Sequence, residues 1–93
     1  MVKVRNMISP RTGNEVANQF IITQNDVETF QSYNTTIAVR QGNGVVVLDN
    51  DAFDYSRTTS KYLKEFLNGN GRKEVERLVA NGSPKYVYSD LNQ

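Results

Sequence analysis

Short runs of apolar and β-branched residues, separated by turn residues, fill the first half of the chain. In Val2–Arg5 the valines alternate with cations, which predicts a short edge strand whose charges discourage pairing between copies. Similar patterns predict further strands over residues 16–23, 28–33, 35–40 and 45–48. The last of these, Val45–Leu48, is apolar without alternation, as is typical of a strand that is covered on both faces.

Turn residues divide these strands into hairpins. Ser9–Asn14 contains proline and glycine and predicts a turn after the first strand. Gln24–Asp26 interrupts the pattern between residues 20–23 and 29–32, which we therefore expect to form a hairpin. Gln41–Gly44 separates the next two strands, and its Asn-Gly pair predicts a hairpin with a type I′ turn, in which both central residues have positive φ.

The periodicity changes after Asp54. Apolar residues at positions 62, 63, 66 and 67 predict an amphipathic helix over residues 58–67 with one buried stripe. Thr58, Thr59 and Ser60 are three candidate caps for its first turn. Gly69 is the expected left-handed C′ residue after its end.

A second helix is predicted from a cap at Asn70 up to Asn81–Pro84, with a buried stripe at positions 75, 78 and 79. Lys85–Ser89 then alternates and returns to the sheet. The sequence therefore predicts a single α+β domain over residues 1–93. In this domain an antiparallel sheet of four to five strands carries two C-terminal helices packed on one face.

The composition excludes several classes of protein. Of the 93 residues, 38% are hydrophobic, which is enough for one core. The chain has no cysteine and no histidine, so it lacks thiolate chemistry and the commonest general base. Its apolar runs are too short to cross a bilayer, and no secretory signal follows Met1. We therefore expect a soluble intracellular protein without membrane contact.

Two strings in the chain resemble a family of small proteins from bacterial viruses. The first is Ser32–Arg40, which resembles the family pattern S-Y-x-T-x-I-A, and the second is Tyr55–Tyr62, which resembles Y-S-x-T-T-S-K. The resemblance covers about residues 8–67 and leaves out the second helix and the final strand. The family has no activity that assigns a role to any residue. The resemblance therefore implies only a viral protein in the cytoplasm of an infected bacterial host.

Asp49, Asp51 and Asp54 form an acidic loop before the first helix. Clustered carboxylates suit divalent cations, and the spacing of the first two aspartates fits the start of a calcium loop. However, Phe53 stands where a further oxygen ligand is needed, and no glycine follows it. A solvated loop is the favoured interpretation, with a metal site as the alternative, so no metal ligand is predicted.

Hydroxyls and cations meet at the start of the first predicted helix. Thr58, Thr59 and Ser60 follow one another beside Arg57 and Lys61. Because a helix start has unpaired N–H groups and partial positive charge, this cluster could hold a phosphate, with the cation at position 11 adding to it. The alternative is that the hydroxyls are caps and nothing more.

A basic strip extends from this helix start. Arg57, Lys61 and Lys64 share one helical face, and Arg72 and Lys73 continue the positive charge. Phosphate contacts supply much of the affinity of proteins for nucleic acid. The aromatic side chains that could stack on bases are Tyr33, Phe53, Tyr55 and Tyr62. The alternative is an ordinary solvated helix face, and the formal net charge of +1 gives little long-range attraction for nucleic acid.

No catalytic residue and no cofactor are predicted. Serine and threonine are plentiful, but no histidine can activate them. Ser60 and Lys61 do not face each other, because adjacent helix residues point about 100° apart. Stoichiometric binding therefore remains as the expected role, since small viral proteins without chemistry commonly act by occupying a host surface.

Three binding hypotheses follow from these patterns. The first is an accessory protein that binds a host protein, and its sharpest form is inhibition of a host defence system (anti-CRISPR-like). The second is nucleic-acid binding through the helix start and the basic strip, and the third is self-association through an exposed sheet edge. The candidate binding residues are Arg11, Tyr33, Asn34, Tyr55, Arg57, Thr58, Ser60, Lys61 and Lys64.

Overall fold

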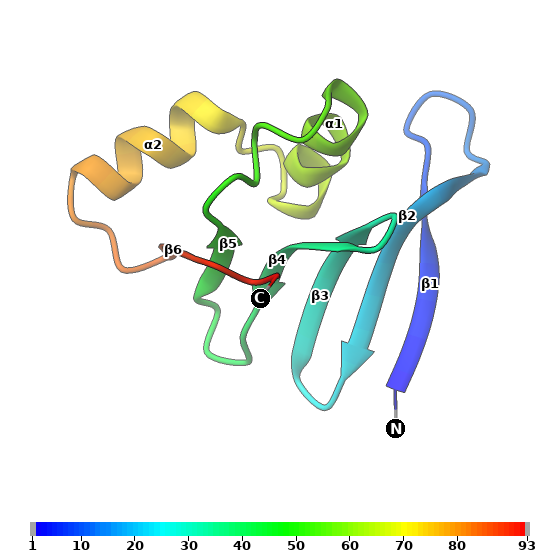
Figure 1. Ribbon diagram of the computed structural model, residues 1–93, viewed down its shortest axis with the longest axis horizontal. Coiled ribbons are helices and arrows are strands. Elements are labelled where there is room, and N and C mark those ends of the chain that lie inside the picture. Colours follow the sequence, from blue (N-terminus) through cyan, green and yellow to red (C-terminus); the bar gives the residue numbers. More distant parts are fainter. Residues whose placement is uncertain (1, 93) are drawn as a thin grey trace.

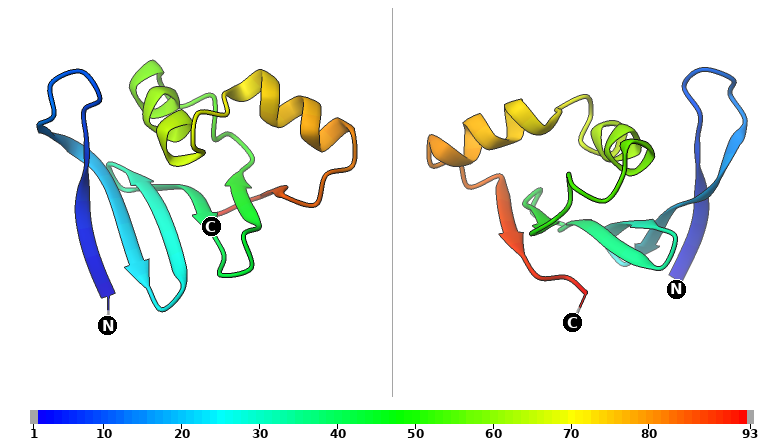
Figure 2. Two further views of the ribbon diagram at one scale, coloured as in Figure 1. Left: turned by 180° about the vertical axis from the view of Figure 1, so that it is seen from behind. Right: turned by 45° about the horizontal axis from the view of Figure 1, so that its top comes forward.

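The computed structural model describes residues 2–92 as one sheet with two helices above it (Figure 1). The strands are β1 (Val2–Ile8), β2 (Glu15–Gln24), β3 (Val27–Ser32), β4 (Thr35–Arg40), β5 (Val46–Asp49) and β6 (Tyr86–Ser89), and they lie side by side in chain order. The helices α1 (Arg57–Phe66) and α2 (Arg72–Ala80) connect β5 to β6. The predicted α+β class and the two helices on one face are confirmed (Figure 2).

The strand count and the last strand differ from the prediction. The sheet has six strands rather than four to five, and β6 pairs with β5 in parallel while all other pairs are antiparallel. The reason is the connection between β5 and β6. The two helices of this connection return the chain to the end of the sheet at which β5 begins. A strand that follows such a crossover runs parallel to the strand before it.

The two faces of the sheet differ in what covers them. Residues opposite each other in neighbouring strands share a face, and one row passes from Ile21 through Phe30 and Ala38 to Leu48. These four side chains are at most 3% exposed and form the core with the helices. The adjacent row lies on the helix-free face and consists of Val4, Ile22, Thr29, Val39, Val47 and Val87.

Strand β5 is covered well on one face only. Val46 and Leu48 face the helices and are buried, whereas Val47 lies in the helix-free row and is half-buried. The prediction of cover on both faces is therefore confirmed for the helix side and wrong for the other. The continuous apolar run reflects a row of β-branched residues across the helix-free face, not a second layer of helices.

The predicted hairpins are present, but one turn type is wrong. The β2–β3 pairing joins Phe20 to Gln31 and the β4–β5 pairing joins Arg40 to Val46. The β4–β5 loop spans residues 41–45, and only its Gly44 has positive φ, at 90°. A type I′ turn needs a two-residue loop with positive φ at both residues. In the observed loop, Gly44 is instead the last residue of a turn that begins at Gln41. The Gly44 N–H donates to the Gln41 carbonyl at 2.9 Å and closes this turn, so the loop is longer than a type I′ turn allows.

Helix α1 has the predicted stripe but not the predicted ends. Tyr62, Leu63, Phe66 and Leu67 are all at most 5% exposed. The N-cap is Ser56, whose hydroxyl accepts from the Thr59 N–H at 3.0 Å, so none of the three predicted caps acts as one. At the other end Asn68 takes the C′ position with φ of 59°, one residue before Gly69. Two hydrogen bonds, Asn68 to Glu65 and Gly69 to Lys64, close the helix there.

Helix α2, in contrast, begins one residue later than predicted. Its N-cap is Gly71, and the Asn70 side chain donates to the Tyr86 hydroxyl at 2.9 Å instead of capping the helix. Val75 is fully buried, while Leu78 and Val79 are partly buried against the core. The predicted stripe of α2 is therefore confirmed. Asn70, the predicted cap, instead holds the loop before α2 to β6.

Candidate binding surface at the start of helix α1

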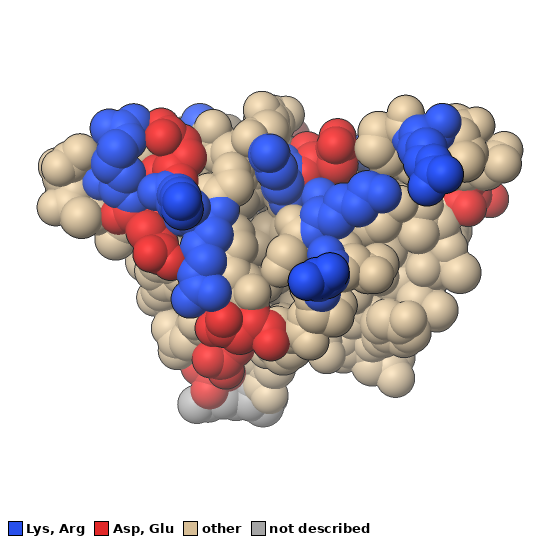
Figure 3. All heavy atoms as spheres, turned by 90° about the horizontal axis from the view of Figure 1, so that it is seen from above, with Lys and Arg blue, Asp and Glu red and all other residues tan. Residues whose placement is uncertain are grey.

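A groove separates the exposed face of α1 from the start of α2. It has a volume of about 610 Å³ and is lined by Phe53, Asp54, Ser56, Arg57, Ser60, Lys61, Lys64, Gly71 and Arg72. Figure 3 shows the helix side of the molecule, where basic side chains gather with acidic ones between them. Four of the lining side chains are cations and one is a carboxylate. We call this hollow the cation groove.

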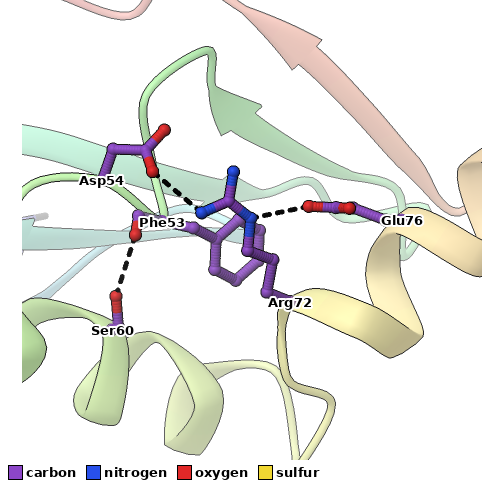
Figure 4. Close-up of polar contacts among 5 residues, drawn as sticks. All are labelled: Phe53, Asp54, Ser60, Arg72 and Glu76. Carbon is purple, nitrogen blue, oxygen red and sulfur yellow. Dashed lines mark hydrogen bonds and ion pairs between the residues drawn. The ribbon is translucent and has the colours of Figure 1, made fainter.

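One wall of the cation groove is fixed by Arg72 (Figure 4). Its guanidinium pairs with Asp54 at 2.8 Å and with Glu76 at 2.6 Å, and it lies 5.9 Å from the centre of the Phe53 ring. The hydrogen bonds that Arg72 donates to Glu76 and Asp54 raise the pKa of Arg72. Because both acceptors are carboxylates, the charge of Arg72 is largely compensated within the protein. Its main contribution is to hold the loop of Phe53 against α2.

The other wall carries cations that form no ion pair with any described residue. Arg57, Lys61 and Lys64 follow one another at four and three residues along α1 and are all exposed. Within residues 2–92 none of the three belongs to an ion pair, although the Lys61 ammonium lies 5.4 Å from the centre of the Tyr62 ring. The predicted face of α1 is therefore present, and its positive charge is available to an anionic partner.

Two of the three hydroxyls at the helix start, those of Thr59 and Ser60, are used by the fold rather than offered to a ligand. Thr59 is buried, and its hydroxyl lies 3.0 Å from both the Ser32 and the Ser56 hydroxyls. Ser60 lines the cation groove, but its hydroxyl donates to the Phe53 carbonyl at 3.2 Å. Thr58 is exposed and lies outside the groove lining. A phosphate cradle built from three hydroxyls is thus wrong, and the cations alone remain.

A second hollow lies on the other side of the α1 start. Its volume is about 190 Å³ and its lining is uncharged: Ser32, Tyr33, Thr35, Ile37, Tyr55, Ser56 and Thr59. Tyr33 is 59% exposed and Tyr55 is 43% exposed, so both rings are accessible. We call this hollow the tyrosine pocket. Ser56 lines it and the cation groove as well, so the two hollows adjoin at this residue.

The geometry of Tyr55 depends on the buried residue Asp49, which is 3% exposed. The Tyr55 hydroxyl donates to one carboxylate oxygen at 2.6 Å. The Asp51 N–H donates to the same oxygen, while the Leu91 N–H and the Asn92 side chain donate to the other. Burial alone would raise the pKa of Asp49, but these hydrogen bonds outweigh burial and lower it. The hydrogen bond between the Tyr55 hydroxyl and Asp49 also raises the pKa of Tyr55 to about 12.

The three aspartates of the acidic loop therefore have separate environments. Asp49 is surrounded by four donors and Asp54 pairs with Arg72, whereas Asp51 is exposed. Across residues 2–92, no group of three His, Cys, Asp or Glu side chains is placed to hold a metal ion. The sequence could not show that Asp49 is buried, because its donors Leu91 and Asn92 lie more than 40 residues away.

Three predicted binding residues, Thr58, Arg11 and Asn34, line neither hollow. Arg11 is exposed in the turn between β1 and β2 and lines neither hollow. Asn34 is exposed in the β3–β4 turn beside Tyr33, but it is also outside the lining of the tyrosine pocket. The structure thus brings together Tyr33, Tyr55, Arg57, Ser60, Lys61 and Lys64. None of the described helices is long and apolar enough to cross a membrane.

Comparison with known proteins places the chain in a family without assigning it an activity. The model of a family of unknown function (DUF8033) matches residues 2–82, from the first strand to the end of α2. No curated protein and no solved structure matches the chain.

Proposed function

We propose that this chain, which belongs to that family of unknown function, is a non-enzymatic accessory protein of a bacterial virus that binds a host protein. In its most specific form, this binding inhibits a host defence system in the cytoplasm of the infected cell, as an anti-CRISPR protein does. The resemblance of residues 8–67 to small viral proteins supports the origin. The binding role is supported by the surface at the start of α1.

The observation that carries the proposal is the junction at Ser56. Through this residue the cation groove and the tyrosine pocket adjoin, and together they carry two accessible tyrosines and three cations that form no ion pair within residues 2–92. Tyrosine and arginine are the residue types that dominate binding energy at protein interfaces. The net charge of +1 is also suited to short-range contacts rather than long-range steering.

The side chains of this surface indicate the chemistry of the partner. An acidic segment would lie along Arg57, Lys61 and Lys64, and an apolar or aromatic side chain would enter the tyrosine pocket between Tyr33 and Tyr55. Pairs at the rim of such an interface contribute mainly to association rate, whereas the buried aromatic anchor contributes most to the lifetime of the complex. The partner is therefore expected to combine both features within a short stretch of its surface.

The test is capture of the partner followed by measured binding. The protein is crosslinked in host lysate, the partner is identified by mass spectrometry, and the purified pair is titrated by calorimetry. A Tyr33→Ala change and a Lys61→Glu/Lys64→Glu pair should each weaken the complex at least tenfold. A Lys73→Glu/Lys85→Glu pair reverses two exposed cations outside both hollows and should leave the affinity within twofold. Equal affinity for all variants would contradict the proposed surface.

A cell-based measurement addresses the specific form of the proposal. The protein is expressed in bacteria whose CRISPR system restricts an infecting virus, and plaque formation is counted. Protection of the virus by the natural chain but not by the Tyr33→Ala variant supports inhibition of the defence system. Full restriction in the presence of well-expressed natural protein would contradict inhibition of the system tested, while the captured complex would still establish a host partner.

Nucleic-acid binding is the second candidate, and one observation favours it. Arg57, Lys61 and Lys64 span about 10 Å along α1, which is long enough to contact two successive phosphates. Tyr33 and Tyr55 next to them could stack on bases. Binding to single- and double-stranded oligonucleotides should then weaken steeply with salt, and the Lys61→Glu/Lys64→Glu pair should reduce the salt slope by about two. No binding at low salt would exclude this candidate.

A further inference from the structure

Strand β1 is an open edge of the sheet. It pairs with β2 along Val2–Ile8, and across residues 2–92 no other strand lies beside it. In Figure 1 it is the blue strand at one end of the sheet, away from α2 and from the C-terminus. The main-chain groups on its outer side can therefore accept a further strand, which is a common mode of peptide recognition.

The side chains of β1 separate sharply between the two faces of the sheet. Val2 is 51% exposed and Val4 is 61% exposed, and both project on the helix-free face. Lys3 and Arg5 are exposed on the helix side, where Arg5 lies opposite Ile21. Within residues 2–92 neither cation belongs to an ion pair. The edge thus presents apolar side chains on one face and uncompensated positive charge on the other.

The nearby carboxylates form no ion pair with Arg5 within residues 2–92. Glu28 and Glu65 line the hollow of about 260 Å³ beside Arg5. Glu28 pairs with Arg40 at 2.9 Å, and neither carboxylate pairs with Arg5. Arg5 is therefore available to a carboxylate that arrives from the outer side of β1.

A second copy of the chain does not fit this edge. In an antiparallel pair of two β1 strands centred on Val4, Lys3 would lie opposite Arg5 of the second copy. Centring the pair on Lys3 or Arg5 would place each of these residues opposite itself. Like charges directly opposite each other destabilise a strand pair. Registers further along the strand meet the irregular pairing between Asn6 and Ile8.

We infer that the outer edge of β1 binds an extended segment of another protein in which apolar and acidic side chains alternate. The acidic residues would lie opposite Lys3 and Arg5, and the apolar residues opposite Val2 and Val4. An apolar side chain there would extend the row that runs from Val4 across the helix-free face to Val87. This site is separate from the surface at the start of α1 and does not depend on the function proposed for it.

The probe is a blocked hexapeptide of alternating glutamate and valine, compared with one of alternating lysine and valine. Binding is followed at neutral pH by amide chemical shifts and hydrogen exchange of the full chain. The glutamate peptide should shift the amides of residues 2–8 and slow their exchange, and the lysine peptide should do neither. Shifts confined to α1, or equal binding of both peptides, would overturn the inference.

Charge reversal provides the second arm of the test. A Lys3→Glu/Arg5→Glu variant should bind the glutamate peptide about tenfold more weakly or worse and should now favour the lysine peptide. The Lys73→Glu/Lys85→Glu pair is the matched control and should leave both affinities unchanged. Unaltered preference in the first variant, with circular dichroism showing an intact fold, would overturn the inference. So would a dimer of the natural chain that protects the β1 amides, because a second copy would then be the occupant.

Discussion

Replacement of Asp49 by asparagine should destabilise the protein by about 2–4 kcal/mol. Each carboxylate oxygen of Asp49 accepts two hydrogen bonds, with donor distances of 2.6 and 3.1 Å at one oxygen and 3.0 and 3.2 Å at the other. An asparagine keeps one oxygen and turns the other acceptor into a donor, so two of the four bonds are lost. A hydrogen bond to a charged group contributes about 1.5–3 kcal/mol. Since Leu91 and Asn92 lie near the surface, water can replace part of this loss.

The assay is urea unfolding of Asp49→Asn beside a matched control. Asp51→Asn changes an exposed carboxylate two residues away and should alter the free energy of unfolding by less than about 0.5 kcal/mol. At about 4–8 °C per kcal/mol for a domain of this size, the Asp49 variant should also melt at least about 8 °C lower. Equal stability of the two variants would refute the view that the carboxylate is a buried structural acceptor.

The same carboxylate should make stability depend on acidity. The pKa of Asp49 is lower in the folded protein than its ordinary value, so the unfolded chain takes up a proton more readily. The contribution of Asp49 is therefore complete above the unfolded pKa, near 4, and is lost as the pH falls through the folded pKa. Urea unfolding of the Asp49→Asn variant should show a weaker loss of stability between about pH 5 and pH 2 than the natural chain. An identical acid profile in both chains would contradict this assignment.

Three further predictions concern the helix α1 and its surroundings. Ser56→Ala should cost about 1 kcal/mol in thermal unfolding because it removes the N-cap bond, while Thr58→Ala, one of the expected caps, should cost less than half of that. Leu63→Ala should cost about 2–5 kcal/mol in urea unfolding because Leu63 is 0% exposed, and a smaller loss would mean that the core collapses around the cavity. Ultraviolet titration of the natural chain should show the ionisation of one tyrosine near pH 12, and this signal should be absent in Tyr55→Phe.

Local patterns in the sequence predict what depends on local geometry. The spacing of apolar residues in α1 predicts its buried stripe, and β-branched runs between turn residues predict the hairpins of β2–β3 and β4–β5. The spacing of Arg57, Lys61 and Lys64 likewise predicts the cationic wall of the groove. In each case the relevant distances are set by the repeat of a single element, so no tertiary contact is needed to derive them.

The N-cap and the direction of β6 depend on how the chain leaves the element before them. Two successive turns, closed by the N–H groups of Ala52 and Asp54, carry the chain out of β5 and leave Ser56 extended with φ of −168°. This exit fixes where helical dihedrals begin, and it places the cap two residues before the first expected one. Similarly, the run of Lys85–Ser89 shows that a strand exists but contains no signal for its direction. The direction follows from the crossover through both helices.

The tyrosine pocket shows most clearly why the candidate site could be predicted only in part. Tyr33 and Tyr55 are 22 residues apart, and they line one hollow because the Ser32 and Thr59 hydroxyls meet beneath them at 3.0 Å. Tyr33 itself occupies the β3–β4 turn with φ of 53°. A sequence pattern identifies each ring as a candidate but cannot place one against the other.

The hydrogen bonds of Asp49 link this pocket to the end of the chain. Asp49 holds the Tyr55 hydroxyl with one oxygen and the segment of Leu91 and Asn92 with the other. The Asn92 side chain in turn bonds the N–H and the carbonyl of Thr36 at 2.8 Å each, as a paired strand would. Loss of the carboxylate therefore releases the ring of Tyr55 while the cations of α1 keep their positions. Asp49→Asn should weaken partner binding through the tyrosine pocket and leave the contribution of Lys61 and Lys64 intact, which a double-mutant cycle would separate.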